Sequence, residues 1–229
     1  MSAPDVRSFT VGPVQENSYV VRADPASRSA LMIDPGDEPQ RLLDAVQALD
    51  VEIEAILITH CHFDHIGAVA PVAHATGAPV YCPQIERPVL SDVMRWVPPG
   101  FGPFESYEAD HTLAGGERLS LAGLDIEVLF TPGHSPGHLT YAIPGALLSG
   151  DVLFQGSVGR VDLPGGDWLT LERSIAGLLG RFPGETIVYP GHMGVTTLQR
   201  ERDTNPFLAE LRERVPAAAP AAGPGAPAR

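Results

Sequence analysis

The amino-acid sequence predicts an α/β protein in which two mixed β-sheets pack face to face, with helices on their outer faces. Runs of short strands alternate with helical segments, and the second half of the chain resembles the first in its order of elements. Residues 1–215 contain no recognisable linker, so we expect one domain there. Residues 216–229 are almost entirely Ala, Pro and Gly, which bury too little apolar surface to fold, and we expect a disordered tail.

The first half is expected to form five strands and two helices. Short runs of apolar and β-branched residues between turn residues predict the strands, and apolar residues three and four apart predict the helices. The mostly apolar run 54–59 is typical of a strand buried on both faces. The expected strands are 7–11, 18–22, 30–34, 54–59 and 79–82, and the expected helices are 39–49 and 65–76. Residues 83–111 contain many Pro and Gly, which predicts a partly helical excursion with a long loop.

The second half is expected to form five more strands and two more helices. Leu171, Ile175 and Leu178 fall on one side of the helix predicted to begin at Trp168. The expected strands are 118–121, 125–131, 139–143, 146–149 and 186–189, and the expected helices are 168–179 and 206–214.

Composition narrows the class of function. The net charge is -13, and such an acidic balance argues against nucleic-acid binding. All fifteen basic residues are arginine. The two cysteines, Cys61 and Cys82, form no CxxC pair, so we expect reduced thiols and a cytoplasmic location. The chain has no signal-peptide pattern and no long apolar run, so we expect no membrane association. These features are typical of a soluble enzyme of small molecules.

The run Thr59-His60-Cys61-His62-Phe63-Asp64-His65 follows an apolar strand and carries four metal-binding side chains within six residues. Imidazole suits zinc, iron and related transition metals, and carboxylate adds a harder oxygen donor. Chance placement of three histidines and one aspartate in this run is improbable in a chain with only eight histidines. The run therefore predicts one wall of a metal site.

Three further segments place a metal-competent side chain after a predicted strand, each beside a glycine that permits a sharp turn. They are Thr131–His134, Ser149–Asp151 and Tyr189–His192. Each alone would more often be structural, but beside the 59–65 run they become ligand candidates. His138 lies near this site in the sequence and is expected to support a ligand. His74 and His111 are expected to be structural or surface residues.

These residues resemble the ligand signature of the metallo-β-lactamase superfamily, and the resemblance covers most of residues 5–215. The matching residues, in the family's order, are His60, His62, Asp64, His65, His134, Asp151 and His192. The resemblance implies a four-layer αββα sandwich with a site for two divalent metal ions at one edge of the paired sheets. Zinc is the expected metal, with iron or manganese as alternatives.

The resemblance also implies how the ligands are divided. One metal would bind His60, His62 and His134, the second would bind Asp64, His65 and His192, and Asp151 would bridge both. Asp64 and Asp151 are accordingly the expected catalytic carboxylates. Cys61 lies between two ligands and is expected to face away from them.

Within the superfamily, further segments resemble the single-domain, glyoxalase II-like thioester hydrolases. These segments are Asn17–Tyr19, Asp34–Gly36, Gly150–Phe154, Gly159–Gly166, Thr196–Thr197, Glu201 and Asn205–Phe207. The resemblance implies hydrolysis of S-acyl thioesters such as S-lactoylglutathione by a hydroxide that bridges the metals. The thiol carrier could be glutathione, another small thiol or coenzyme A. We expect a small-molecule thioester as partner and a monomer or small homo-oligomer.

The alternative is a persulfide dioxygenase of the same fold. That branch shares Thr59–His62 and Gly159-Arg160 followed by Asp162, and the resemblance would place a single iron on His60, His134 and Asp151. A metal-binding protein without catalysis is a third possibility. β-Lactamases of the best-known class instead have Cys at the position of Asp151.

Arg160 is the expected substrate-binding residue outside the metal site. Its guanidinium could pair with a substrate carboxylate, or it could form a structural ion pair with Asp162, and both readings stay open. Asp34 is expected either to hold a metal ligand in place without binding the metal itself, or to be a turn residue. The residues expected to hold the fold are Asn17, Tyr19 and Glu201.

Overall fold

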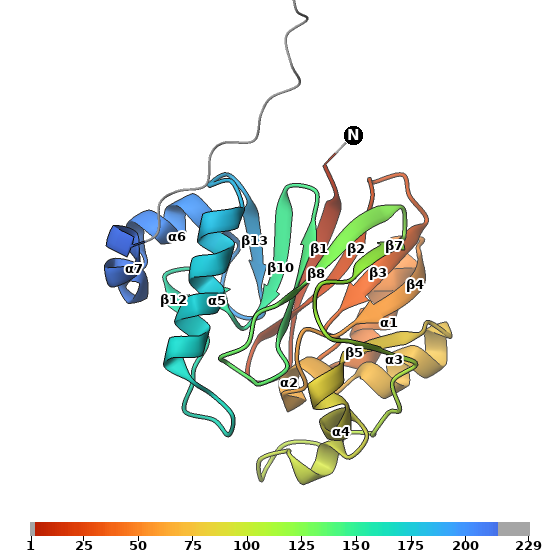
Figure 1. The fold of residues 1–229 in the computed structure, drawn as a ribbon. Helices are drawn as coiled ribbons and strands as arrows, with labels where there is room; N and C mark the ends of the chain where they lie inside the picture. The colour runs from red at the N-terminus through yellow and green to blue at the C-terminus, as the bar shows by residue number, and fades with distance from the viewer. Residues whose placement is uncertain (1–2, 215–229) are drawn as a thin grey trace, which may run out of the picture.

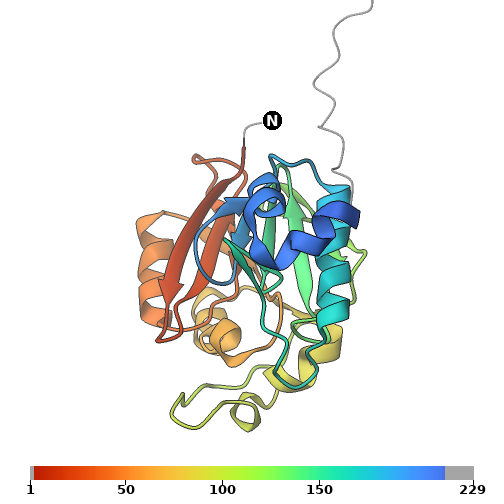
Figure 2. The same cartoon turned by 90° about the vertical axis from the view of Figure 1, so that its left-hand side faces the viewer.

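Two mixed β-sheets pack face to face between two layers of helices in the computed structural model, which describes residues 3–214 (Figure 1). Figure 2 shows the four layers edge-on, with α1 outside the first sheet and α5 outside the second. The predicted αββα class is therefore confirmed. The expected tail at 216–229 lies outside the described residues. Among residues 3–214, no helix has both the length and the apolar character needed to cross a membrane.

The first half of the chain builds the first sheet, in the order β1-β2-β3-β4-β5-β6. Strands β1 to β3 pair antiparallel, and strands β3 to β6 pair parallel. The strands are β1 (Asp5–Val11), β2 (Glu16–Arg22), β3 (Ser29–Ile33), β4 (Glu52–Leu57), β5 (Val80–Pro83) and β6 (His111–Leu113).

The second half builds the second sheet, in the order β14-β13-β10-β9-β8-β7. Only β10 and β13 pair parallel. The strands are β7 (Arg118–Leu121), β8 (Leu124–Phe130), β9 (Leu139–Ile143), β10 (Ala146–Gly150), β13 (Ile187–Pro190) and β14 (Thr196–Thr197). A separate hairpin joins β11 (Leu153–Phe154) to β12 (Ser157–Val158).

Helices cover the outer faces and fill the connections. The α-helices are α1 (Pro39–Ala48), α2 (Phe63–Ile66), α3 (Val69–Thr76), α4 (Arg87–Leu90), α5 (Trp168–Arg181), α6 (Leu198–Thr204) and α7 (Ala209–Arg214). The 3₁₀-helices are η1 (Gln84–Glu86), η2 (Val93–Arg95) and η3 (Pro206–Leu208).

Strand alternation separates the buried side chains into three apolar layers, because successive residues of a strand point to opposite faces. In β3, Leu31 and Ile33 face the second sheet, while Met32 packs with Leu42 of α1. Leu147 of β10 packs outward against α5. The layer between the sheets includes Tyr19, Leu57, Ile126, Val128, Tyr141 and Leu148. The central strands of both sheets are thus buried on two faces, which leaves the loops at the strand ends to carry binding residues.

The ten predicted strands are all present, with ends within two residues of those expected. The single helix expected over 65–76 was wrong, because α2 ends at Ile66 and α3 begins at Val69. A continuous helix would need an N–H at Pro71, which proline lacks. Gly67 also packs tightly, since a Cβ there would lie 2.4 Å from the carbonyl oxygen of Gly36. The helix expected at 206–214 begins as η3, and β6, β14, α6 and the β11–β12 hairpin were not predicted.

Candidate metal centre

Four loops converge at one edge of the paired sheets. Strands β8 and β10 both run antiparallel to β9, and β13 runs parallel to β10, so β8, β10 and β13 end at the same edge of their sheet. The residues that follow these three ends are His134, Asp151 and His192. The loop after β4 brings the 59–65 run from the first sheet to the same edge. The structure therefore brings all seven predicted ligands together.

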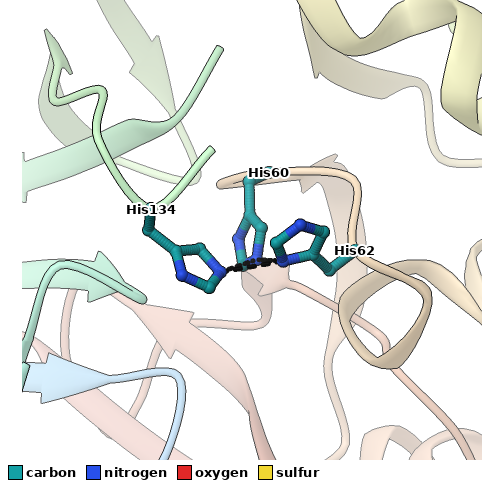
Figure 3. A group of neighbouring side chains, drawn as sticks. All are labelled: His60, His62 and His134. Atoms are coloured by element: carbon teal, nitrogen blue, oxygen red, sulfur yellow. Dashed lines mark hydrogen bonds between the residues drawn. The ribbon is translucent and has the colours of Figure 1, made fainter. Parts of the chain in front are cut away.

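The first group consists of His60, His62 and His134, whose rings point toward one another (Figure 3). Nε2 of His134 lies 3.1 Å from Nε2 of His60 and 2.8 Å from Nδ1 of His62. Nε2 of His60 lies 3.1 Å from Nδ1 of His62. Three ring nitrogens from two loops thus converge on one small volume.

Burial keeps the rings of His60 and His62 neutral. It lowers the pKa of His60 well below the usual value, and the nearby histidines lower it further. Burial, followed by the neighbouring His134, lowers the pKa of His62 to about 4. A neutral imidazole is the form that binds a metal ion.

Hydrogen bonds on the far side of two rings locate their protons. His134 Nδ1 donates to the carbonyl oxygen of Arg160 at 2.7 Å, so the neutral tautomer of this ring carries its lone pair on Nε2. The Thr59 hydroxyl donates to Asp34 at 2.6 Å, so it accepts a hydrogen bond from Nδ1 of His60 at 3.1 Å. Two lone pairs then face each other across 3.1 Å. This arrangement fits a cation, and the nitrogen donors suit a transition-metal ion.

The second group combines oxygen and nitrogen donors from Asp64, His65 and His192. Nε2 of His192 lies 3.2 Å from Asp64 Oδ2, and Nε2 of His65 lies 3.9 Å from the same oxygen. His65 is fully buried, and its Nε2 has no hydrogen-bond partner among the described residues. Its Nδ1 donates to Asp34 at 3.0 Å, so Nε2 is directed into the group. An orphaned ring nitrogen beside a carboxylate fits a second cation.

Asp151 lies between the two groups and contacts both. Its Oδ1 is 3.4 Å from Nε2 of His65, and its Oδ2 is 3.4 Å from Nε2 of His134 and 3.6 Å from Nε2 of His192. Gly191 allows this approach, because a Cβ there would lie 2.2 Å from Oδ1 of Asp151. The role of Asp151 as a bridge between two metals stays a prediction. Its carboxylate lies between the two ligand groups, where a bridging ligand would have to lie.

Carboxylates give the second group a negative electrostatic potential. Burial lowers the pKa of His65, but Asp151, Asp34 and Asp64 outweigh it and raise the pKa well above the usual value. Burial likewise lowers the pKa of His192, and Asp64 and Asp151 reverse that effect. The Asp151 carboxyl is ionised, because the neighbouring histidines overcome the effect of burial and hold its pKa below the usual range. A positive charge is therefore favoured at this group.

His138 holds the backbone of Asp151, which agrees with the prediction that His138 supports a metal ligand. The Asp151 N–H donates to Nε2 of His138 at 3.0 Å, and Nδ1 of His138 donates to the Thr131 hydroxyl at 3.1 Å. The ring of His138 also stacks on His60 at 4.9 Å. Burial lowers its pKa well below the usual value, so the ring is neutral and can accept this hydrogen bond.

Two residues expected to hold the fold also brace the loop that carries His192. Asn17 Nδ2 donates to the carbonyl oxygens of Pro190 and Met193 at 3.1 and 2.9 Å. Tyr19 Oη donates to the Pro190 carbonyl oxygen at 2.6 Å. The loop of the second sheet is thereby tied to β2 of the first sheet.

Arg160 contributes its backbone to the site, while its side chain forms an exposed ion pair. Its carbonyl oxygen accepts the hydrogen bond from His134. Its guanidinium donates two hydrogen bonds to Asp162, both at 2.6 Å. The ion pair with Asp162 is therefore present, and the contact with substrate stays a prediction.

Two buried acids beside the centre were not predicted. Glu86 accepts hydrogen bonds from both loops of the first group. Glu16 lies 3.7 Å from Nδ1 of His65, and burial raises its pKa well above the usual value. Glu86 is a lone acid shortly after β5, and Glu16 sits at a strand start, so neither position carries a sequence signal. Cys61 packs in the apolar layer with its sulfur 3.5 Å from that of Cys82, facing away from the ligands as expected.

The chain belongs to the metallo-β-lactamase superfamily, whose family model matches residues 11–192. A probable metallo-hydrolase from Bacillus subtilis, YqgX, is 40% identical over 88% of this chain and 96% of its own length. The hydroxyacylglutathione hydrolase GloC from Haemophilus influenzae is 32% identical over 89% of this chain and 98% of its own length. These relatives place the chain among metallo-hydrolases with a divalent-metal centre.

Several solved structures share the fold. The B3 metallo-β-lactamase BLEG-1 is 38% identical, with a TM-score of 0.84 over 90% of this chain and all of its own. TTHA1623 in a di-iron-bound form is 42% identical, with a TM-score of 0.73 over 88% of this chain and all of its own. ETHE1 from Myxococcus xanthus is 28% identical, with a TM-score of 0.72 over 88% of this chain and 83% of its own. The fold therefore leaves the substrate open.

Proposed function

We propose that this chain is a two-metal hydrolase of small S-acyl thioesters, such as S-lactoylglutathione. The observation that carries the proposal is the Asp151 carboxylate, which lies within 3.6 Å of ring nitrogens from both ligand groups. A carboxylate so placed can hold two divalent ions close together, the arrangement that two-metal hydrolases use. The similarity to GloC, named for hydroxyacylglutathione hydrolysis, supports thioesters as the substrate class.

The chain's own residues would hold and orient the reacting groups. A pair of bound divalent ions would lower the pKa of water toward about 7 and would take up the negative charge on the carbonyl oxygen and the leaving thiolate. Asp64 and His192 are partly exposed, whereas His60 and His65 are fully buried. We therefore expect substrate to approach from the side of Asp64 and His192. Asp64 is an acceptor there, because hydrogen bonding to His192 outweighs burial and lowers its pKa.

Three assays on the purified, metal-analysed protein test the proposal. Release of thiol from S-lactoylglutathione, oxygen uptake with glutathione persulfide and ring opening of a chromogenic cephalosporin are measured at matched enzyme concentrations. We expect about two metals per chain and thioester cleavage that a chelator abolishes and added metal restores. β-Lactam cleavage without thioester cleavage would instead assign the activity in the name of BLEG-1 to this chain.

The second candidate is a persulfide dioxygenase with one iron. The sequence Gly159-Arg160 followed by Asp162, which resembles that branch of the superfamily, favours it. The second ligand group argues for the hydrolase, because Asp64, His65 and His192 would have no metal to bind in a one-iron enzyme. Oxygen consumption without thioester cleavage, in a protein with one iron per chain, would overturn the proposed hydrolase.

A further inference from the structure

Glu86 is a buried acid that lies outside the predicted ligand set. It is the last residue of η1, directly after β5, and only 5% of its surface is exposed. A carboxylate is costly to bury unless its oxygens accept hydrogen bonds. The donors that satisfy Glu86 therefore indicate what it holds in place.

All three hydrogen bonds to Glu86 come from the two loops that carry the three-histidine group. Its Oε2 accepts the backbone N–H of Cys61 at 2.6 Å. Its Oε1 accepts the Ser135 hydroxyl at 2.5 Å and the backbone N–H of Gly137 at 2.8 Å. Cys61 stands between two of the histidines, and Ser135 directly follows the third. One side chain thus links both loops.

The two loops belong to different sheets, so their relative position is not set by strand pairing. The Cys61 loop follows β4 of the first sheet, and the Ser135 loop follows β8 of the second. Glu86 lies close to the second loop, because a Cβ on Gly137 would be 2.8 Å from Cγ of Glu86. The carboxylate therefore joins the sheets at the edge where the three rings meet.

We propose that Glu86 is a positioning residue for the metal position formed by His60, His62 and His134. Side chains behind the ligands of a metal site raise metal affinity by holding the ligands in a binding geometry. The inference rests on the proposed two-metal centre. It is specific to one position, because the described contacts of Glu86 include none to Asp64, His65 or His192.

Competition with a chromophoric chelator measures zinc affinity at both positions in wild type, Glu86→Ala and Glu86→Gln. We expect Glu86→Ala to weaken one of the two binding events by about 10–100-fold and to leave the other within about threefold. Glu86→Gln should be intermediate, because either amide orientation faces one backbone N–H with its NH₂ group. Repeating the titration in the His192→Ala background, which retains the three-histidine group, assigns the weakened event to that group.

Glu201 provides a matched control. It is also fully buried and accepts three hydrogen bonds, from the Gly156 N–H at 2.7 Å, the Thr196 hydroxyl at 2.6 Å and Asn205 Nδ2 at 2.9 Å. None of these donors adjoins a member of the three-histidine group. Glu201→Gln should therefore lower the unfolding temperature much as Glu86→Gln does, without weakening zinc binding.

The outcomes separate the role of Glu86 from the metal centre itself. Wild type with two zinc ions, and Glu86 variants that bind both as tightly, would overturn the role of Glu86 alone. Equal loss of zinc affinity in the Glu86→Gln and Glu201→Gln proteins would also overturn it, because the effect would then be general destabilisation. Wild type that binds no metal would overturn the two-metal centre as well.

If Glu86→Ala does not fold, Ser135→Ala removes one of the three hydrogen bonds and should weaken the same event by a few-fold.

Discussion

The two ligand groups meet at Asp151 but favour a cation in different ways. The three-histidine group contains only nitrogen donors, and burial together with the neighbouring rings lowers the pKa of His60 and of His62. The Asp64, His65 and His192 group is surrounded by carboxylates, which raise the pKa of both its histidines. The first group depends on geometry and the second on charge, so different substitutions should disable each.

The groups also differ in their supports and their exposure. A backbone carbonyl and a hydroxyl orient His134 and His60, and a carboxylate, Asp34, orients His65. The side chain of His192 is 21% exposed, whereas that of His134 is 2% exposed. We therefore expect the second position to exchange its metal faster and to face the incoming substrate.

Removing the shared ligand should have the largest effect. Asp151→Ala takes the negative charge and the oxygen donors from both groups, so we expect both metals to be lost and hydrolysis to fall by at least about 10³-fold. Metal analysis and initial rates on the same preparation check this. Asp151→Asn keeps the shape and removes the charge, and should retain part of the metal. A fully metallated Asp151→Ala protein with normal turnover would contradict the bridging role.

Removing one ligand from each group should separate the two positions. His192→Ala should leave about one metal per chain on the buried three-histidine group, and His134→Ala should release the metal of that group first. Hydrolysis should fall in both proteins by about 10²-fold or more, because both metals act on the reacting groups. Metal stoichiometry after gel filtration distinguishes the positions. Loss of the same metal from both variants would show that the groups are not independent.

Asp34 should matter more to the second group than to the first, because it contacts His65 directly and reaches His60 through the Thr59 hydroxyl. Asp34→Ala removes the acceptor for Nδ1 of His65 and should weaken the second metal by about 10–100-fold. It also leaves the Thr59 N–H and hydroxyl without their acceptor, at a cost of about 1–3 kcal/mol in the free energy of unfolding. Chelator competition and denaturant unfolding measure the two effects. Asp37→Ala, in the same loop, loses only a local bond to the Glu38 N–H and should change neither.

The fold was predictable because local patterns and packing agree. Most predicted strands are short runs rich in apolar or β-branched residues, and alternation along the central ones matches burial on two faces, as in β3 and β4. Pro71 is a sequence signal for an interrupted helix, but the break at Gly67 was not predictable, because the close contact with Gly36 joins residues far apart in the sequence. Strand β6 has three residues and pairs only with β5, so its pattern was too short to distinguish from the surrounding loop.

The ligands were predictable for a different reason from the residues that hold them. His60, His62, Asp64 and His65 stand in one dense run, and the other three follow strand ends that topology brings to the same edge. Glu86 is a single acid in a segment of mixed composition, and its role arises only when two loops from different sheets fold around it. Such support is a property of tertiary contacts, so a sequence pattern does not carry it.

Replacing Arg160 tests whether its side chain binds substrate, and we expect this substitution to have the smallest effect on catalysis. Its carbonyl oxygen holds His134 whatever the side chain is, so Arg160→Ala should keep its metal content and unfolding temperature. If the guanidinium binds a substrate carboxylate, KM for S-lactoylglutathione should rise by about 3–10-fold with little change in kcat. Asp162→Asn is the matched variant, because it removes the partner that now holds the guanidinium in place at 2.6 Å. A rise in KM for Arg160→Ala alone would assign the side chain to substrate, and an unchanged KM in both proteins would leave the exposed ion pair as its only contact.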